Sequence, residues 1–229
     1  MAGSLRFGTH AWAVATAASI VCAALSACVE VEYLREDRAI QPRAGEAIVF
    51  GRIRFMNDGR EWSPWNPSFV DMMLNIEPKR HFWLRQLDRT AISAELHPDD
   101  DGSLAIRLHP GDYALVGTDE DIESIDSTTG FEIVALLRVA ADQPLIYAGD
   151  VVIVHRYREG WTRSKLSLGE PVLDVRSTAE ETTALEAKYG PLPGPLTTSY
   201  WCVSNALPAE PDYEGLNRAR ELLDRGCPP

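Results

Sequence analysis

The pattern of apolar and polar positions divides the chain into three parts. Residues 11–25 form an almost unbroken apolar run. Between 47 and 175, short stretches alternate apolar with polar residues and are separated by turn residues, a pattern typical of β-strands. Beyond 177 the apolar spacing becomes that of amphipathic helices. The pattern predicts a mainly β protein with one or two helices at its C-terminal end.

The clearest strand is predicted over residues 47–56. Ile53 and Phe55 alternate with two arginines, which places one face of the strand in the core. Gly51 interrupts this strand, as at a β-bulge or a close approach of another backbone segment. Further strands are predicted over 69–76, 81–87, 91–96, 103–108, 113–116, 131–139, 145–154, 163–168 and 171–175. Many short strands separated by turns indicate an antiparallel β-sandwich.

Two helices are predicted after the strands. Ser177 and Glu180 form a capping box, and Gly190 followed by proline ends the first helix. The second helix covers 212–225 and ends before Gly226. Its apolar stripe consists of Leu216, Ala219 and Leu223, and the preceding Tyr200, Trp201 and Cys202 are expected to be buried. This helix most simply packs on the sandwich, and docking of a partner protein is the alternative.

Residues 1–27 have the three parts of a secretory signal peptide. Arg6 is the only lysine or arginine before Cys28, the apolar run follows, and Ser26 and Ala27 supply small residues at a cleavage site. The run is shorter than the roughly 20 residues that a membrane-spanning helix needs. A secretory leader therefore fits better than a transmembrane helix or a buried helix of a cytosolic protein.

The motif Leu-Ser-Ala-Cys at 25–28 resembles the lipobox of bacterial lipoproteins. In that family the cysteine thiol receives a diacylglyceryl group, and a dedicated peptidase cuts just before it. The resemblance implies that Cys28 is the lipid attachment site and the first residue of the mature protein. Because the next residue is Val29 rather than aspartate, it also implies the outer membrane. An ordinary cleaved signal, in which Cys28 has no special role, is the alternative.

Lipidation would keep the protein on a membrane surface without spanning it. Each buried CH₂ contributes roughly 0.8 kcal/mol, and two or three acyl chains exceed what stable anchoring requires. We therefore expect a lipid-anchored protein of the bacterial cell envelope, on the periplasmic or the surface face. Residues 28–45 are predicted to be the membrane tether, 46–176 the β-sandwich domain, and 177–229 a C-terminal helical extension with a disulfide.

The acidic composition narrows the expected partners. The chain has 34 acidic and 22 basic residues, which gives a net charge of −12. Loss of the signal removes one arginine and no acid, so the mature charge is about −13. This charge argues against nucleic acid and against docking on anionic lipid headgroups. A protein partner in the envelope remains open.

The four cysteines leave one pair available for a disulfide. Cys22 departs with the signal, and Cys28 would be lipidated. Cys202 and Cys227 then remain in an oxidising compartment, where we expect them to form a disulfide. A bridge across this separation would contribute roughly 3 kcal/mol to stability in the chain-entropy model. Two unrelated buried thiols are the alternative.

A two-strand motif gives a second resemblance. Asp-Gly-Ser-Leu at 101–104 begins an alternating strand, and Leu-His-Pro-Gly-Asp-Tyr at 108–113 leads into a returning strand. This arrangement is similar to carboxypeptidase-regulatory-like, or transthyretin-like (prealbumin-like), β-sandwich domains, most clearly over 91–116 and more loosely over 47–154. In those domains the aromatic ring, here that of Tyr113, packs inside. The resemblance implies a fold and no activity, because such domains serve as adhesion, stabilising or binding modules.

The sequence offers no catalytic motif. It contains no Gly-x-Ser-x-Gly, no His-Glu-x-x-His and no phosphate-binding loop. The histidines after the signal, which are His81, His97, His109 and His155, are interpreted as surface or turn residues. We therefore predict no catalytic residues and no cofactor, and a non-enzymatic binding or scaffolding module of unknown ligand. A small envelope enzyme with a site built from loops is the alternative.

Two further features have competing interpretations. Asp99, Asp100 and Asp101 are consecutive, whereas a Ca²⁺ loop needs oxygen ligands at alternating positions and a distal bidentate acid. A tight turn without a metal is the prediction here. Trp62 and Trp65 are either part of a packed loop or a candidate interaction patch on the surface.

Overall fold

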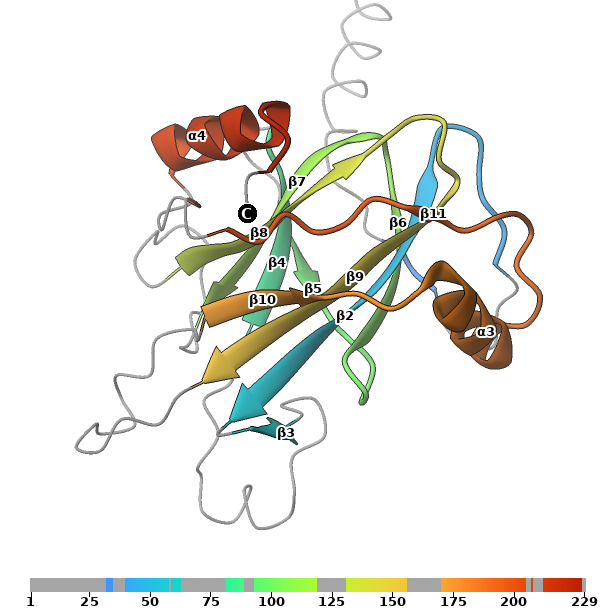
Figure 1. Ribbon diagram of the computed structural model, residues 1–229. Helices are drawn as coiled ribbons and strands as arrows, with labels where there is room; N and C mark the ends of the chain where they lie inside the picture. The colour runs from blue at the N-terminus through green and yellow to red at the C-terminus, as the bar shows by residue number, and fades with distance from the viewer. Residues whose placement is uncertain are drawn as a thin grey trace, which may run out of the picture.

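In the residues that it describes, the structure, a computed structural model, has two β-sheets packed face to face and two helices (Figure 1). It describes residues 32–34, 40–57, 59–62, 81–88, 93–118, 131–155, 170–204, 207 and 212–227. The predicted mainly β class is confirmed. The strands predicted over 69–76 and 163–168 lie outside the described residues.

We call the two sheets A and B. Sheet A has the order β1 (Glu32–Tyr33), β6 (Ser103–Leu108), β2 (Ala47–Asn57), β9 (Leu145–His155) and β10 (Glu170–Asp174), with β3 (Arg60–Trp62) on β2 and β11 (Thr197–Thr198) on β9. Sheet B has the order β5 (Ser93–Leu96), β4 (His81–Gln86), β7 (Gly111–Thr118) and β8 (Phe131–Val139). The helices are α3 (Thr178–Tyr189) and α4 (Tyr213–Asp224).

Sheet A contains a parallel pair at its centre. β2 and β9 run in the same direction, with Ile48 opposite Leu145 and Asn57 opposite His155. The prediction of an antiparallel sandwich needs correction here, although the pairs within sheet B are antiparallel. The chain reaches β9 from β8 of the other sheet and not through a hairpin from β2, so β9 is free to lie parallel to β2.

The core lies between the two sheets. The inward side chains of β2, Ile53 and Phe55, are 1% and 0% exposed, as their alternation predicts. Tyr113, just after the link from β6 in sheet A to β7 in sheet B, is also buried. Its hydroxyl donates a 2.8 Å hydrogen bond to the carbonyl of His109. This bond satisfies the polar end of a ring that otherwise packs in apolar surroundings.

Gly51 lies where two backbones approach closely. The register between β2 and β9 shifts between Phe50 and Arg52. A Cβ on Gly51 would stand 2.6 Å from the carbonyl oxygen of Gly149 on β9. The predicted bulge or close approach is therefore confirmed.

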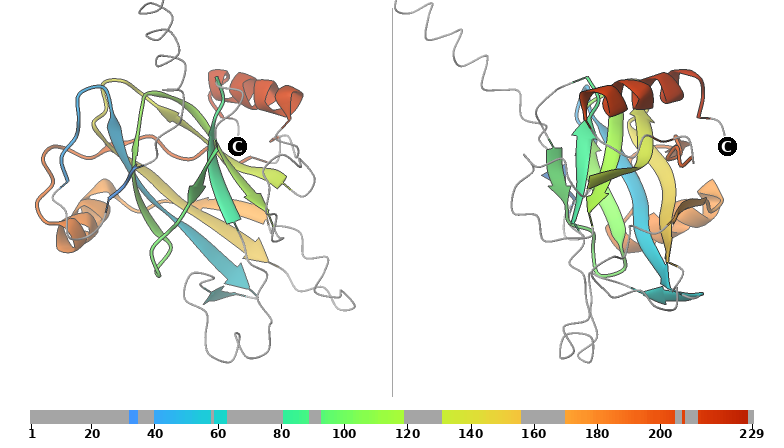
Figure 2. Two further views of the ribbon diagram at one scale, coloured as in Figure 1. Left: turned by 180° about the vertical axis from the view of Figure 1, so that it is seen from behind. Right: turned by 90° about the vertical axis from the view of Figure 1, so that its left-hand side faces the viewer.

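Each helix covers the outer face of one sheet (Figures 1 and 2). α3 begins with the predicted capping box of Ser177 and Glu180, and its Leu185 and Tyr189 pack on the outer face of sheet A. α4 packs on sheet B through Leu216, Ala219 and Leu222. The predicted stripe is wrong at its last member, because Leu222 is buried and Leu223 packs only at the margin.

The segment before α4 buries two of the three residues predicted to be buried. Trp201 and Cys202 are each 3% exposed, as predicted. Tyr200 is 43% exposed, and its ring contacts the edge of Tyr147. The prediction that Tyr200 is buried is wrong: Trp201 packs between the two sheets and Cys202 between sheet B and α4, whereas the Tyr200 ring lies against Tyr147 and keeps one side in solvent.

The two ends of the sandwich differ in the length of the chain segments that join the strands there. At the end we call the turn end, short turns at 43–46, 109–110 and 140–144 join or precede strands. At the opposite end, called the connection end, lie the last residues of β2, β7 and β9 and the first of β4. The chain segments 63–80, 119–130 and 156–169 therefore attach at the connection end, which is the lower end in Figure 1.

Part of the stretch 28–45 packs on the sandwich. β1 pairs with β6, and Leu34 and Ile40 are 7% and 4% exposed against sheet A and α3. Among the described residues, contacts with the sandwich are present from Glu32 onward. Among the described residues, no helix has the length and apolar character needed to cross a membrane.

Candidate functional site

Two clusters of charged side chains lie beside α3. The lysine cluster consists of Lys188, Asp99, Asp101 and Ser103. The arginine cluster consists of Arg52, Arg54, Arg176, Asp150 and Glu181. Both are built from residues far apart in the sequence, which α3 and sheet A bring together.

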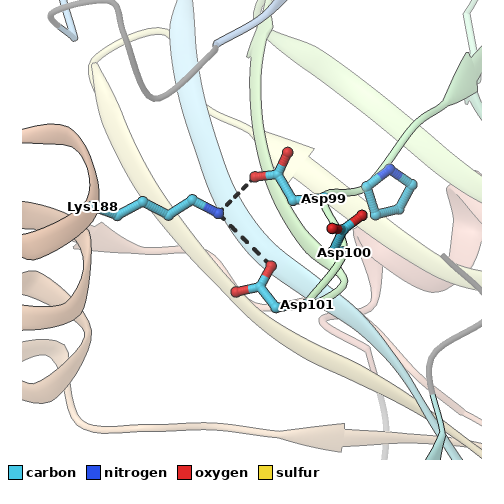
Figure 3. Close-up of a pocket in the computed structure, with 5 residues that line it drawn as sticks. Asp99, Asp100, Asp101 and Lys188 are labelled. Carbon is cyan, nitrogen blue, oxygen red and sulfur yellow. Dashed lines mark hydrogen bonds and ion pairs between the residues drawn. The ribbon is translucent and has the colours of Figure 1, made fainter. Parts of the chain in front are cut away.

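The lysine cluster is organised by the turn between β5 and β6. The amide of Gly102 donates to the carbonyl of Asp99 at 2.7 Å, and the amide of Ser103 donates to Oδ1 of Asp101 at 3.0 Å. These bonds form the tight turn that the consecutive aspartates predict. Lys188, in the last turn of α3, reaches across to it and lies between Asp99 and Asp101 (Figure 3).

The charges around Lys188 determine whether its amine is protonated. Its Nζ lies 2.6 Å from Oδ2 of Asp99, 2.6 Å from Oγ of Ser103 and 3.7 Å from Oδ1 of Asp101. Burial lowers the pKa of Lys188, but the bond to Asp99 and the nearby negative charges outweigh it and raise that pKa above its ordinary value. A serine nucleophile would need a neutral lysine as its base. Here the lysine stays charged, so the arrangement is an ion pair that ties α3 to the turn.

A wide, open pocket lies beside this ion pair. It has a volume of about 580 Å³ and is lined by Pro98, the three aspartates and Lys188 (Figure 3). A smaller pocket of about 250 Å³ shares Asp99 and is lined by residues of β1 and β6. Within the described part of the chain, no group of three or more His, Cys, Asp or Glu side chains is placed to hold a metal ion.

The arginine cluster surrounds two buried carboxylates. Asp150 on β9 is 1% exposed and Glu181 on α3 is 3% exposed. Oδ2 of Asp150 lies 4.0 Å from Arg52, 3.6 Å from Arg54 and 3.5 Å from Arg176. Oε2 of Glu181 lies 3.9 Å from Arg52 and 3.4 Å from Arg176. Arg52 and Arg54 alternate with the core residues of β2, and Arg176 directly precedes α3, whose start lies over them.

Burial governs the titration of these carboxylates. It raises the pKa of Asp150 and of Glu181 above their ordinary values, although the nearby arginines act in the opposite direction. Oδ1 of Asp150 is buried without a hydrogen-bond partner among the described residues. The cluster is thus a buried ion-pair network between α3 and sheet A, whose arginines are 20% to 30% exposed.

The structure pairs Cys202 with Cys227 in a disulfide, as predicted. Their Cα atoms are 5.6 Å apart. Cys202 exchanges backbone hydrogen bonds with Leu136 on β8, and Cys227 directly follows the end of α4. The bridge therefore fastens the end of α4 to sheet B.

The other predicted residues are placed only in part. Cys28 and Trp65 lie outside the described residues, and Trp62 is in β3, opposite Phe55 of β2. His97 and His109 are exposed and precede prolines, which agrees with their interpretation as surface or turn residues.

Sequence reasoning missed both charged clusters. One signal was present, because Asp150 stands in the apolar stretch 145–154, where a charge requires a partner. Its partners are Arg52 and Arg54 on β2 and Arg176 from beyond the strands, and no spacing rule connects them to Asp150. The sequence contained no signal for Lys188 either, because a basic residue in the last turn of a helix is common.

No protein-family model, curated protein or solved structure matches this chain. The function therefore has to be argued from the residues and their geometry.

Proposed function

We propose that this chain is a lipid-anchored lipoprotein of the bacterial cell envelope, on the outer membrane. Its sandwich would act as a non-enzymatic binding or scaffolding module for another envelope component. The proposal rests on the lipobox-like motif at 25–28, which follows an apolar run and small residues.

The disulfide supports this proposal by limiting the roles open to Cys28. Cys202 and Cys227 are bonded to each other, so neither is available to pair with Cys28. A disulfide also suits an exported protein, because such bonds persist in oxidising compartments. Cys28 then stands alone in the mature chain, at the position where a lipoprotein carries its lipid.

We propose further that the sandwich is of the transthyretin-like type. We leave aside the two- and three-residue strands and count the others along the chain. Sheet A, β6-β2-β9-β10, then has its strands in the order fourth, first, seventh, eighth. Sheet B, β5-β4-β7-β8, has them in the order third, second, fifth, sixth. Two four-stranded sheets in this order, with Tyr113 buried after the Pro110-Gly111 link, support this fold.

A binding role is favoured over catalysis by the lysine cluster. Its serine contacts the Nζ of Lys188 in a pocket wall, and that lysine is held in its charged form. For the binding surface we propose the patch containing Trp62 and Trp65, because the chain around them attaches at the connection end. Tryptophan is a frequent anchor of protein interfaces.

The test is the intact mass of the native protein from the membrane fraction, measured without reductant. We expect a chain that starts at Cys28, carries added acyl mass, and is two protons lighter than the thiol form. Cys28→Ser is the matched variant, and it should appear as a water-soluble protein with the same disulfide. A wild-type protein without acyl mass would contradict the proposal and favour a diffusible role.

A further inference from the structure

The position of β1 determines how a lipid at Cys28 would present the sandwich. Four residue steps separate Cys28 from Glu32, where pairing with β6 begins. A fully extended chain of that length spans at most about 14 Å. The distance from the lipid attachment point to the folded domain is therefore short, whatever conformation residues 28–31 adopt.

β1 is held by more than its backbone pairing. The amide of Leu34 donates to the carbonyl of Ala105 at 2.9 Å, and Leu34 is buried. Glu32 forms an ion pair with Arg107, whose side chain is 7% exposed. Tyr33 donates to the carbonyl of Glu95 and accepts from the amide of His97. These contacts on both sides of β1 make it a fixed part of the domain.

The register of β1 places its start at the turn end. Glu32 lies opposite Arg107, and Arg107 lies opposite Ile48, the second residue of β2. From that level β2 continues to Asn57, about 30 Å further along the strand direction. A tether of at most about 14 Å cannot reach across that distance.

We propose that the lipidated protein stands with its turn end against the bilayer and its connection end directed away from it. This proposal rests on lipidation of Cys28 and adds the orientation of the domain. The partner of the turn end is the lipid headgroup surface.

Charge favours this orientation over one in which the β1 edge lies flat on the membrane. Lying flat would press the turn of Asp99, Asp100 and Asp101 toward the bilayer, and these side chains are exposed. Anionic headgroups repel such a cluster. The turn end carries the exposed Arg43 and Arg138 beside its acids, so its charge is more balanced.

Spin labels on single introduced cysteines can measure the orientation. Cys28 is acylated and Cys202 is bonded to Cys227, so an introduced cysteine is the free thiol in the mature protein. Ala141→Cys labels the turn end, Glu61→Cys labels the connection end, and Asp100→Cys labels the acidic turn; all three positions are exposed. The lipidated proteins are placed in phosphatidylethanolamine and phosphatidylglycerol vesicles that contain a nickel-chelating lipid.

We expect strong relaxation enhancement by the nickel lipid at Ala141→Cys and background values at the other two labels. Equal enhancement at all three labels, or the strongest at Glu61→Cys or Asp100→Cys, would overturn the proposed orientation. The intact mass of each sample shows separately whether the lipid is present. A sample without lipid contradicts the proposed function, whereas a lipidated sample with the wrong label order contradicts only the orientation.

A linker insertion tests whether the short tether is the cause. Fifteen glycine and serine residues placed between Val29 and Glu30 add about 20 Å of average reach. The enhancement at Ala141→Cys should then fall severalfold. An unchanged value would mean that direct adhesion, and not the tether, holds the turn end on the membrane.

Discussion

At the scale of single residues, Gly51 illustrates how one missing side chain permits a strand pairing. The carbonyl of Gly149 occupies the space that a Cβ on Gly51 would need. The obstacle is backbone and cannot rotate away as a side chain could. The central pairing of β2 with β9 therefore depends on glycine at this position.

We predict that Gly51→Ala lowers the free energy of unfolding by about 1–3 kcal/mol, the usual cost of overfilling a packed site. Gly194→Ala is the matched control, because a Cβ there meets nothing within 4 Å. It should change stability by less than about 0.5 kcal/mol. Urea denaturation of both variants measures the difference, and equal stabilities would show that the two strands can separate without cost.

Asp150 leads to a prediction about pH. Burial raises its pKa in the folded protein, so the folded state holds this proton more tightly than the unfolded chain does. The stability it contributes is full below the unfolded pKa and is lost as the pH rises through the folded pKa. The substitution Asp150→Asn removes this pH-dependent loss of stability, because an asparagine side chain does not titrate. The free energy of unfolding of this variant relative to wild type should increase as the pH rises above the unfolded pKa of about 3.9.

Glu61 provides the opposite case within the same network. Its hydrogen bond to Arg54 is the main cause that lowers its pKa, so it stabilises the fold above its unfolded pKa and loses that contribution as the pH falls. Glu61→Gln should therefore lose stability relative to wild type as the pH rises. Urea denaturation at a series of pH values checks both slopes, and slopes of the same sign would contradict the assignment.

These residues also show where sequence reasoning succeeds. The alternation of Ile53 and Phe55 with two arginines predicted the core face of β2 correctly, because a strand has only two faces. It could not predict that the arginines surround Asp150, because that contact depends on the parallel register of β9. The local sequence pattern determines which face of the strand a residue lies on. The pairing of distant strands determines which side chains it contacts.

At the scale of elements, α4 depends on its disulfide and its apolar stripe. The stripe covers sheet B, and the bridge fastens the helix end to Cys202 on the same sheet. The sequence predicted the bridge and the helix, but missed Leu222 in favour of Leu223, since these residues stand three and four positions after Ala219 and both spacings fit one helix face.

We predict that replacing Cys202 and Cys227 together by serine lowers the free energy of unfolding by about 3 kcal/mol. Hydrogen exchange should accelerate first in α4 and in the adjoining strand β8. Uniform acceleration throughout the molecule would show that α4 does not open separately. Ser177→Ala in the capping box of α3 serves as a comparison, with an expected loss of about 1 kcal/mol.

At the scale of the whole molecule, the segment before β2 belongs to the domain. Leu34 and Ile40 fill the space between sheet A and α3. The sequence favoured a membrane tether over 28–45 because this stretch is rich in charged residues. Two apolar residues among them were too few to predict a segment that packs on the domain. Their burial depends on α3, which the chain supplies more than 130 residues later.

We predict that a soluble variant starting at Glu30 keeps its stability, whereas one starting at Gly45 loses about 3 kcal/mol or more. Burial of one large aliphatic side chain contributes about 1.5–3 kcal/mol, and the shorter variant lacks two. It also leaves Arg107 without Glu32. Urea denaturation compares the two variants, and equal midpoints and slopes would show that the segment only rests on the surface.

The separation of the two ends has a consequence for how such a protein can change over evolutionary time. The segments 63–80, 119–130 and 156–169 attach at one end, while the paired strands and both helices keep their contacts elsewhere. Insertions and substitutions in these segments leave the strand register untouched. One scaffold can therefore vary at that end while its disulfide and the pairing of β1 with β6 stay the same.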